Sequence, residues 1–598
     1  MQEFLLRNSY NPFCLSPEQI ETLKKIVPQV EFYFTDLRDG IQGASFSPSL
    51  ENQKNVAELI SHYINAVNGI LEGGYAGATQ NEQEKFEFLK ENGINYSSFS
   101  SSTVSGKISE EHFEPMINSK SETCTIFVKC SDSQVGKVLK ISQEENLGLI
   151  KDSIWYLKEK GKRVVVDMEH FFDGYYEEDK EYSKKCILTA LECGVETVVL
   201  CDTLGKTSPI KVEKCILELC DNEKSSDLAE KIKGKLGLHL HEDNYYTKES
   251  IIRALSTGNV KHIQGNFGYA GERIGNSPLA LLWVSLFENY DIDVFENHPN
   301  REKIWGNLQI TYTQVSKLLT GNFPTKVDSI LNFRNYIHAA GMHTGALDKD
   351  EKSYSIISCK LKKLLQIENY PGLTGQAGKS NVNYYLEPSG LLDGLDDEEK
   401  NALTNRILDF LKEPDALGYT GFLASFLLES YRIKEDKVEY LDDFTSEFLG
   451  IEGIKAEINL GKRKEHKTKV IVKMHNENYE LEITEREDQL NGVFHEFVMI
   501  LAEKLKLKHN YIENLELLAY NSKAQTTNTD AKVVTKLVFR DKESGELFSV
   551  LSENNNADIA GINAIKEAFS YFILCKEGKI NHVQDKMLEL QYGNIELN

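Results

Sequence analysis

Eight short apolar runs lie between residues 30 and 276, and segments with apolar residues at helical spacing separate them. The runs cover residues 30–40, 69–75, 94–102, 123–133, 162–170, 195–205, 235–243 and 260–276. Their apolar residues are continuous rather than alternating, which is typical of parallel strands buried under helices. Eight strand–helix repeats in roughly 260 residues are the usual content of a closed parallel barrel. We therefore predict an α/β fold with a (β/α)8 TIM barrel as the catalytic domain, over residues 30–303.

The rest of the chain predicts three further parts, because 598 residues exceed what one hydrophobic core supports. Residues 1–29 are expected to form an N-terminal arm with one helix. Residues 304–440 predict a helical linker subdomain, with two helices around Pro414 and Asp415. Strand and helix patterns alternate over residues 441–598, which indicates an α+β domain.

The charge balance excludes two classes of partner. With 92 acidic and 68 basic residues, the chain carries a formal net charge of -24, which repels nucleic acids and anionic membrane surfaces. The ten cysteines include no Cys-x-x-Cys pair, so reduced structural thiols are expected. No apolar run reaches the roughly 18 residues that a membrane span needs. We expect a cytoplasmic enzyme without a nucleic acid or membrane partner.

Every predicted strand ends on polar side chains. They are Arg38 and Asp39, Glu72, Ser100, Ser131, Glu169 and His170, Asp202 and Thr203, His239 and His241, and Asn266. Strands that merely end in polar loops would explain the serines, but not this supply of carboxylates, imidazoles and an arginine. Because a TIM barrel builds its active site at the C-terminal ends of its strands, we expect these groups to share one rim.

The stretch from Leu236 to Asn244 predicts two imidazoles on one face of a strand. Side chains alternate between the faces of a strand, so His239 and His241 point the same way. Asp39 would add a carboxylate, and Asn276 in the loop after the eighth run would add a carbonyl oxygen. Oxygen and nitrogen ligands without a thiolate favour Mg²⁺ or Mn²⁺, with Zn²⁺ as an alternative, and leave room for a bidentate α-keto acid. Taken alone, a His-x-His pair is more often part of an ordinary exposed strand, and Asp39 a turn residue.

Several motifs resemble one enzyme family. FTDLRDGIQG from Phe34, the His-x-His strand, GYAGERIGN and the domain after residue 440 are together similar to the acyl-CoA-dependent synthases that include isopropylmalate, homocitrate and citramalate synthases. VVVDMEHFFDGYYEEDKEYSKKCILTALECGVETVVLCDTLGKTSP resembles the citramalate synthase branch most closely. IHAAGMHTGAL, then Tyr354, GQAGKSN and DALGYTGFLASFLL extend the similarity through the linker.

The resemblance implies an acyltransferase that carries out a Claisen condensation. Acetyl-CoA, the co-substrate, would lose a methyl proton, its enolate would attack the ketone of an α-keto acid, and thioester hydrolysis would release CoA. In the citramalate synthase branch the keto acid is pyruvate, the product (R)-citramalate, and the pathway isoleucine biosynthesis. The alternative is a 2-isopropylmalate synthase of leucine biosynthesis, which uses 2-oxoisovalerate, because methylene-sized differences are worth only ~1–3 kcal/mol in a pocket. A non-catalytic paralogue is a third interpretation.

The resemblance also implies roles for single residues. It assigns catalysis to Arg38, Glu169, His343 and Tyr354, substrate binding to Arg38, Gln42, Glu72 and Thr203, and metal binding to Asp39, His239, His241 and Asn276. Arg38 would neutralise the developing oxyanion, and Thr203 would hold the keto-acid carboxylate. His343 would transfer protons from a linker segment that covers the barrel mouth.

The domain over residues 441–598 resembles the family's regulatory dimerisation domain, which implies a homodimer. Its run SENNNADIAGINAIKEAF places a helix N-terminus after a strand, and such an end favours a carboxylate ligand, here isoleucine or leucine as an effector. The alternative is a helix capped by Asn556 or Asp558 within a dimer interface.

Some positions depart from the family pattern. The acidic residue of the first motif stands at Asp36, two positions after its place in the family. Glu242 and Leu204 each occupy a position where the family has an Asn, and Gln134 occupies one where many members have a His. Residues 485–489 replace a glycine- and proline-containing motif of the last domain. The departures leave the proposed metal ligands intact, so they bear on the choice of keto acid and on the effector response.

Overall fold

A computed structural model describes most of the chain between residues 15 and 592. The description leaves out residues 44–45, 78, 104–109, 323–329, 414–418, 437–450, 461–464, 475–476, 487–497, 499–500, 504, 507 and 525–531. The chain forms two compact units, one with residues 1–335, 357–367 and 595–598 and the other with residues 336–356 and 368–594. The domain boundaries expected from the sequence remain predictions.

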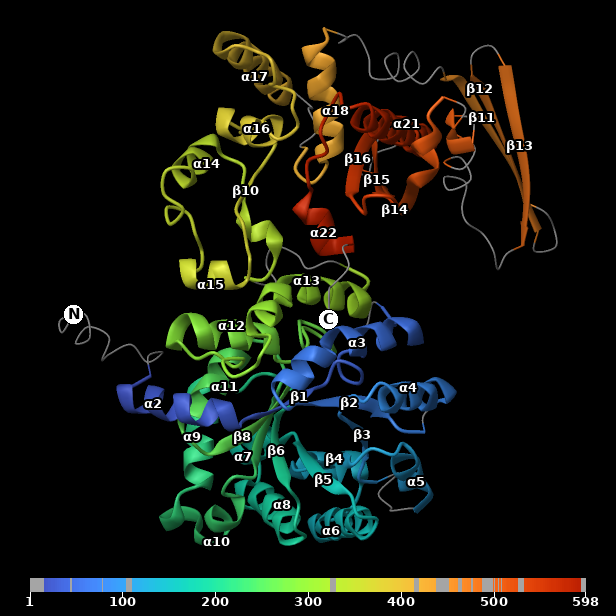
Figure 1. Cartoon of the computed structure of the whole chain (residues 1–598). Coiled ribbons are helices and arrows are strands. Elements are labelled where there is room, and N and C mark those ends of the chain that lie inside the picture. Colours follow the sequence, from blue (N-terminus) through green and yellow to red (C-terminus); the bar gives the residue numbers. More distant parts are fainter. Residues whose placement is uncertain are drawn as a thin grey trace. The chain divides into compact units, whose positions relative to one another are not determined.

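The first unit contains the predicted barrel (Figure 1). Its strands are β1 (Glu31–Phe34), β2 (Ile70–Tyr75), β3 (Tyr96–Ser101), β4 (Thr123–Lys129), β5 (Arg163–Glu169), β6 (Thr197–Asp202), β7 (Leu236–Leu240) and β8 (Val260–Gly265). All eight are parallel, and β1 pairs with β8 to close the barrel. Each strand lies within one of the eight apolar runs, so the predicted fold class is confirmed.

Helices follow every strand and cover the barrel. They are α3 (Leu50–Ala66), α4 (Gln80–Glu91), α5 (Glu110–Asn118), α6 (Gln143–Glu159), α7 (Phe171–Glu177), α8 (Lys180–Glu192), α9 (Pro209–Leu219), α10 (Asn222–Ile232), α11 (Thr247–Ser256) and α12 (Leu279–Tyr290). Local sequence fixes their starts: Ser142 and Glu145 form a capping box at α6. The helix expected before the barrel is α2 (Pro17–Ile26), and α13 (Arg301–Thr320) and α15 (Cys359–Leu364) complete the described α-helices of this unit.

The second unit combines helices with two antiparallel sheets. Its helices are α14 (Gly341–Leu347), α16 (Lys379–Leu386), α17 (Asp397–Leu411), α18 (Leu423–Lys434), α21 (Ala557–Lys576) and α22 (Lys586–Tyr592). Two short strands, β9 (Ile337–His338) and β10 (Tyr370–Pro371), pair with each other. One sheet has β11 (Ile451–Leu460), β12 (Glu465–Met474) and β13 (Glu477–Arg486), and the other β14 (Leu515–Ala524), β15 (Val533–Asp541) and β16 (Leu547–Asn554).

These elements confirm the two helices expected around Pro414 and the strands expected after residue 440. A helix expected over residues 490–506 lies mostly outside the described residues. At the start of α21, Asn556 Oδ1 accepts the Ile559 N–H at 3.2 Å, so the expected helix cap is present. Effector binding there stays a prediction.

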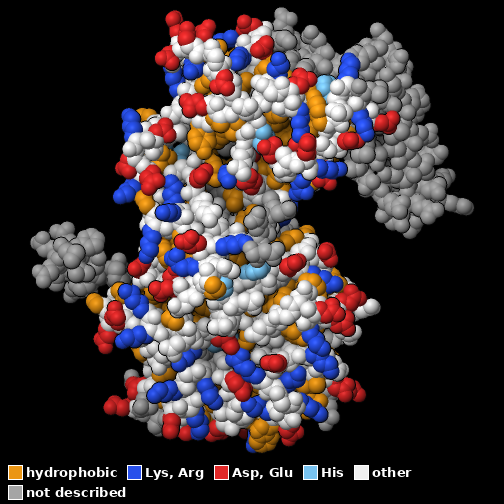
Figure 2. Space-filling view, in the orientation of Figure 1, with side chains coloured by type: hydrophobic (Ala, Val, Ile, Leu, Met, Phe, Trp, Pro, Cys, Tyr) orange, Lys and Arg blue, Asp and Glu red, His pale blue; other side chains and the backbone are white. Residues whose placement is uncertain are grey.

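The described surface carries many charged side chains, and no described helix is both long and apolar enough to span a membrane. Figure 2 shows Lys and Arg side chains interspersed with Asp and Glu across the visible described face, without a field of one sign. Among the described helices, none combines the length and apolar character needed to cross a membrane.

An aromatic cluster joins the barrel to its last helix. Trp283 of α12 is fully buried and contacts Phe32, with ring centroids 5.8 Å apart, and Phe295, at 5.2 Å. We expect Trp283→Ala to lower the free energy of unfolding by about 3–5 kcal/mol, because a large buried side chain leaves a cavity. Trp155 is 47% exposed and provides the matched control, with an expected change within about 0.5 kcal/mol. Urea unfolding of the full chain, followed by circular dichroism, measures both; equal midpoints would contradict this role for Trp283.

Candidate active site

A cavity of about 330 Å³ opens at the C-terminal ends of the barrel strands. It is lined by Arg38, Asp39, Gln42, Tyr75, Phe99, Phe127, Asp167, Glu169, Cys201, Thr203, His239, His241 and Glu272. Seven of the residues singled out from the sequence therefore share one cavity: Arg38, Asp39, Gln42, Glu169, Thr203, His239 and His241. The rim expected from the strand ends is present.

The turn after β1 presents Arg38 and Asp39 to this cavity. The Gly40 N–H donates to Thr35 O at 3.0 Å and closes the turn. A Cβ atom on Gly40 would lie 2.5 Å from Asp36 O and 2.8 Å from Asp36 Cα, closer than real contacts allow. The glycine after Asp39 is therefore required by the close approach of the backbone.

Asp39, His239 and His241 form a buried triad with ligand atoms within 4.8 Å of one another. Asp39 Oδ2 lies 3.2 Å from His239 Nε2 and 3.8 Å from His241 Nε2. Burial alone would raise the pKa of Asp39, but the charge of Arg38 and the hydrogen bond with His239 hold it well below its usual value. The carboxylate is thus ionised and ready to bind a cation.

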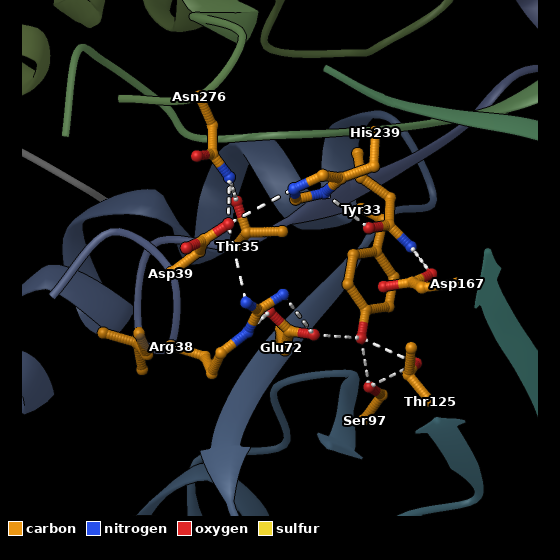
Figure 3. A network of polar contacts seen from close by, with 12 residues as sticks. Tyr33, Thr35, Arg38, Asp39, Glu72, Ser97, Thr125, Asp167, His239 and Asn276 are labelled. Carbon is orange, nitrogen blue, oxygen red and sulfur yellow. Dashed lines mark hydrogen bonds and ion pairs between the residues drawn. The ribbon is translucent and has the colours of Figure 1, made fainter. Parts of the chain in front are cut away.

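A second layer of contacts orients His239. Its Nδ1 lies 2.9 Å from Gln264 Oε1, and Gln264 Nε2 donates to Asp167 Oδ1 at 2.8 Å. Figure 3 shows Asp167, His239 and Asp39 in this network of polar contacts. If Nδ1–H donates to Gln264, Nε2 keeps a lone pair that faces Asp39, which is how metal-binding histidines are commonly held.

Unpaired buried atoms show that the triad fits a metal ion. His241 Nδ1 and Asn276 Oδ1 are buried without a hydrogen-bond partner, while Asn276 Nδ2 donates to Asp39 Oδ2 at 2.7 Å. A carboxylate, two imidazoles and a free amide oxygen are a donor set for a divalent cation. Direct ligation by Asn276 stays a prediction, because its amino group rather than its oxygen faces Asp39 here.

Arg38 is held rigidly beside the triad. Its Nε donates to Glu72 Oε2 at 2.8 Å, its Nη1 lies 3.5 Å from Asp39 Oδ2, and its guanidinium lies 3.9 Å from the centroid of the Phe99 ring. Glu72 is fully buried, does not line the cavity, and also accepts the Tyr33 hydroxyl at 3.1 Å. The structure thus places Glu72 behind the guanidinium, where it orients Arg38.

The remaining cavity residues differ in the contacts that hold them in place. Glu169 forms an ion pair with Lys129, and the hydroxyl oxygen of Thr203 accepts the His170 N–H at 2.9 Å. Gln42 lines the cavity and its backbone N–H donates to Asp39 O at 3.0 Å. These contacts leave their predicted roles open.

His343 and Tyr354 belong to the second unit. Their rings stack with centroids 4.1 Å apart and an interplanar angle of 25°, and Tyr354 is 40% exposed. The structure therefore brings the two predicted partners together, whereas their place over the barrel mouth stays a prediction.

Sequence reasoning missed three polar groups inside the barrel. They are Tyr33, Asp167 and Gln264, all buried. Burial raises the pKa of Asp167 to about 7, although the charge of His239 acts against this. A signal was present, because each is a polar residue within an apolar run, and a buried polar group needs a partner.

We expect metal binding to depend on the triad and on pH. Burial lowers the pKa of His239, but the hydrogen bond and charge of Asp39 raise it above 6.5, so a proton competes with a cation for Nε2. Burial, and then the charge of His239, lower the pKa of His241 to about 4. His241 is therefore neutral near pH 7 and does not contribute to the pH dependence of metal binding there. Mn²⁺ affinity should therefore rise as pH increases beyond 6.5, by at most about tenfold per unit for one released proton.

Calorimetry of Mn²⁺ binding to the chelator-treated full chain measures this dependence. His239→Ala and His241→Ala should lose binding, while His298→Ala, outside the cavity, should retain it. Unchanged affinity in the His241→Ala protein would remove the triad as a metal site.

Known proteins are similar to this chain over the barrel and beyond. A model of the HMGL-like family matches residues 29–297. The (R)-citramalate synthase of Sulfolobus acidocaldarius is 30% identical over 66% of this chain and 72% of that protein, and that of Aquifex aeolicus is 28% identical over 67% and 72%. The 2-isopropylmalate synthase of Buchnera aphidicola subsp. Uroleucon sonchi is 25% identical over 44% of this chain and 48% of that protein. The chain therefore belongs to the HMGL-like family, as an enzyme of the citramalate and isopropylmalate synthase group.

Proposed function

We propose that the protein condenses acetyl-CoA with pyruvate to give (R)-citramalate and CoA. The observation that carries the proposal is the buried Asp39–His239–His241 triad next to Arg38 in one cavity. The similarity to two (R)-citramalate synthases supports the choice within the family. In this reaction the acetyl methyl group loses a proton, its carbon bonds to the keto carbon, and water then cleaves the thioester.

The residues of the cavity match the charges that this reaction develops. A divalent cation on the triad would hold the ketone and carboxylate oxygens of the keto acid and polarise the ketone. Arg38 is fixed by Glu72, so its guanidinium can stabilise the oxyanion without reorganising. Thr203 and Gln42 offer polar groups for the keto-acid carboxylate. Glu169 adds a carboxylate to the polar residues of the cavity. We assign proton transfer to His343, on whose ring Tyr354 stacks.

Aromatic rings limit the size of the keto-acid side chain. Phe99 and Phe127 stack with centroids 5.5 Å apart, and Tyr75 contacts Phe99 edge-on at 5.5 Å. All three line the cavity. We propose that these rings contact the substituent of the keto acid and accommodate the methyl group of pyruvate better than the isopropyl group of 2-oxoisovalerate.

We expect keto-acid-dependent release of free thiol from acetyl-CoA. The kcat/KM for pyruvate should exceed that for 2-oxoisovalerate by about 10–200-fold, the usual discrimination of an apolar pocket. Phe127→Ala should shrink this ratio by widening the cavity. Preference for 2-oxoisovalerate would make the protein an isopropylmalate synthase, and no thiol release with any keto acid would favour a non-catalytic role.

His343→Ala tests the proton relay separately. We expect kcat to fall by about 10²–10⁴-fold with a modest change in the KM for pyruvate, because proton transfer occurs after binding. Met342→Ala is the matched control, since Met342 is adjacent and 83% exposed. A pure KM effect would move His343 to a binding role.

A further inference from the structure

A second cavity of about 330 Å³ lies within the second unit, away from the barrel residues. Three segments form it: residues 368–388, residues 419–423 up to the start of α18, and residues 583–587, which run into the start of α22. Four tyrosines and two carboxylates are among its lining residues, namely Tyr370, Tyr384, Tyr385, Tyr419, Glu368 and Asp585. Neither the metal triad nor the proposed reaction uses any of them.

Asp585 brings an incompletely bonded carboxylate to this cavity. The residue is 7% exposed. Its Oδ1 accepts the N–H groups of Met587 at 3.1 Å and Leu588 at 3.4 Å, which caps α22. Its Oδ2 is buried without a hydrogen-bond partner. A buried acceptor without a partner is uncommon in folded proteins and indicates a missing donor.

The charges around Asp585 come from more than one element. Burial raises the pKa of Asp585, the field of Lys536 of β15 acts to lower it, and the charge of Glu589 acts to raise it. The Lys536 ammonium lies 5.1 Å from the centroid of the Phe422 ring. Lys586 instead pairs with Glu589 at 3.3 Å. No ion pair to Asp585 Oδ2 forms among the described residues, so this oxygen can accept a further donor.

The tyrosine rings supply the walls. Tyr384 and Tyr385 meet edge to face with centroids 4.9 Å apart, and the Tyr385 hydroxyl donates to Pro371 O at 2.8 Å. Tyr419 is fixed by its N–H, which donates to Leu373 O at 2.8 Å. Ring faces attract cations and also offer apolar surface.

Space at the cavity wall depends on one glycine. Gly421 has φ +84°, and a Cβ atom there would lie 2.3 Å from Met587 Cε. The Met587 side chain in the first turn of α22 thus packs against the loop that precedes α18, next to Asp585 in the cavity wall.

We propose that this cavity binds a small protonated primary amine with an apolar body. The ammonium group would donate to Asp585 Oδ2, and the aliphatic body would lie against the tyrosine rings. A primary ammonium fits better than a quaternary one, because the unpaired oxygen needs a hydrogen-bond donor. A carboxylate on the ligand is disfavoured, since Glu368 and Asp585 both line the cavity and would repel it.

Calorimetry and saturation-transfer NMR with butylammonium and the full chain test the proposal. We expect a Kd on the order of 1 mM or tighter, within what so small a ligand can reach. Asp585→Asn should weaken binding by at least about tenfold, because a charge-assisted hydrogen bond is lost. Asparagine keeps an acceptor for the cap of α22, so the variant should fold, which its melting curve checks. Asp409→Asn, at an 82% exposed side chain, is the matched control and should bind normally.

Neutral and anionic analogues and a wall variant complete the test. Butanol and butyrate should bind at least about tenfold more weakly than butylammonium, since neither supplies a cation. Tyr384→Ala, at a 44% exposed ring, should weaken binding without unfolding the protein. Equal affinity for butanol, unchanged binding in the Asp585→Asn protein, or absence of binding by the wild-type chain would each overturn the proposal. None of these measurements depends on catalysis, so their failure leaves the proposed condensation untouched.

Discussion

The barrel mouth is built around the Arg38–Glu72 ion pair. Glu72 is fully buried and Asp39 is 3% exposed, and a buried carboxylate is costly unless a cation accompanies it. Arg38 contacts both, with Nε on Glu72 and Nη1 near Asp39. Arg38 therefore acts to lower the pKa of both carboxyl groups: the pKa of Asp39 lies well below its usual value, whereas at Glu72 burial outweighs Arg38 and the pKa stays raised.

This arrangement leaves the site short of positive charge. Asp167 adds a third buried carboxyl group beside one arginine. Burial raises its pKa to about 7, and the charge of His239 is the largest influence that favours its ionised form. A divalent cation on the triad would supply the missing charge, and its attraction to Asp39 would replace the proton that His239 otherwise retains. The electrostatics of the pocket and the proposed reaction thus favour the same divalent ion.

The fold was predictable because its signal is local and repeated. Each of the eight apolar runs contains one strand, and seven of the eight strands end earlier than their runs: β4, for example, ends at Lys129 and β7 at Leu240. Some of the extra residues, such as His241 and Thr203, line the cavity. The overestimated ends of these runs therefore contain site residues. Asp39, His239 and His241 could be grouped from the sequence because the closed barrel forces strand ends together.

The contacts that the sequence did not reveal join distant residues within the folded chain. The Tyr33 hydroxyl is bonded to Ser97 at 2.5 Å and to Thr125 at 2.7 Å, across three strands. Gln264 links His239 to Asp167. In a linear pattern these residues only interrupt apolar runs, and the closed barrel alone supplies their partners. The cavity around Asp585 is still harder to predict from the sequence, because its three segments share no periodic pattern of residues.

Contacts in the loops around the triad explain in physical terms how the chain departs from the family pattern. Both carboxylate oxygens of Asp36 accept the Phe267 N–H at 3.0 Å, so this acidic group ties the turn after β1 to the loop after β8. Asp243 forms a second tie to that loop, with Arg273 Nε 2.9 Å from its Oδ1. Of the substituted positions, Asp36 therefore holds the frame of the site rather than supplying a ligand atom. Asp39 Oδ2 and His239 Nε2 lie 3.2 Å apart inside this frame, so we expect the change at Asp36 to act on the substrate's surroundings rather than on the reaction class.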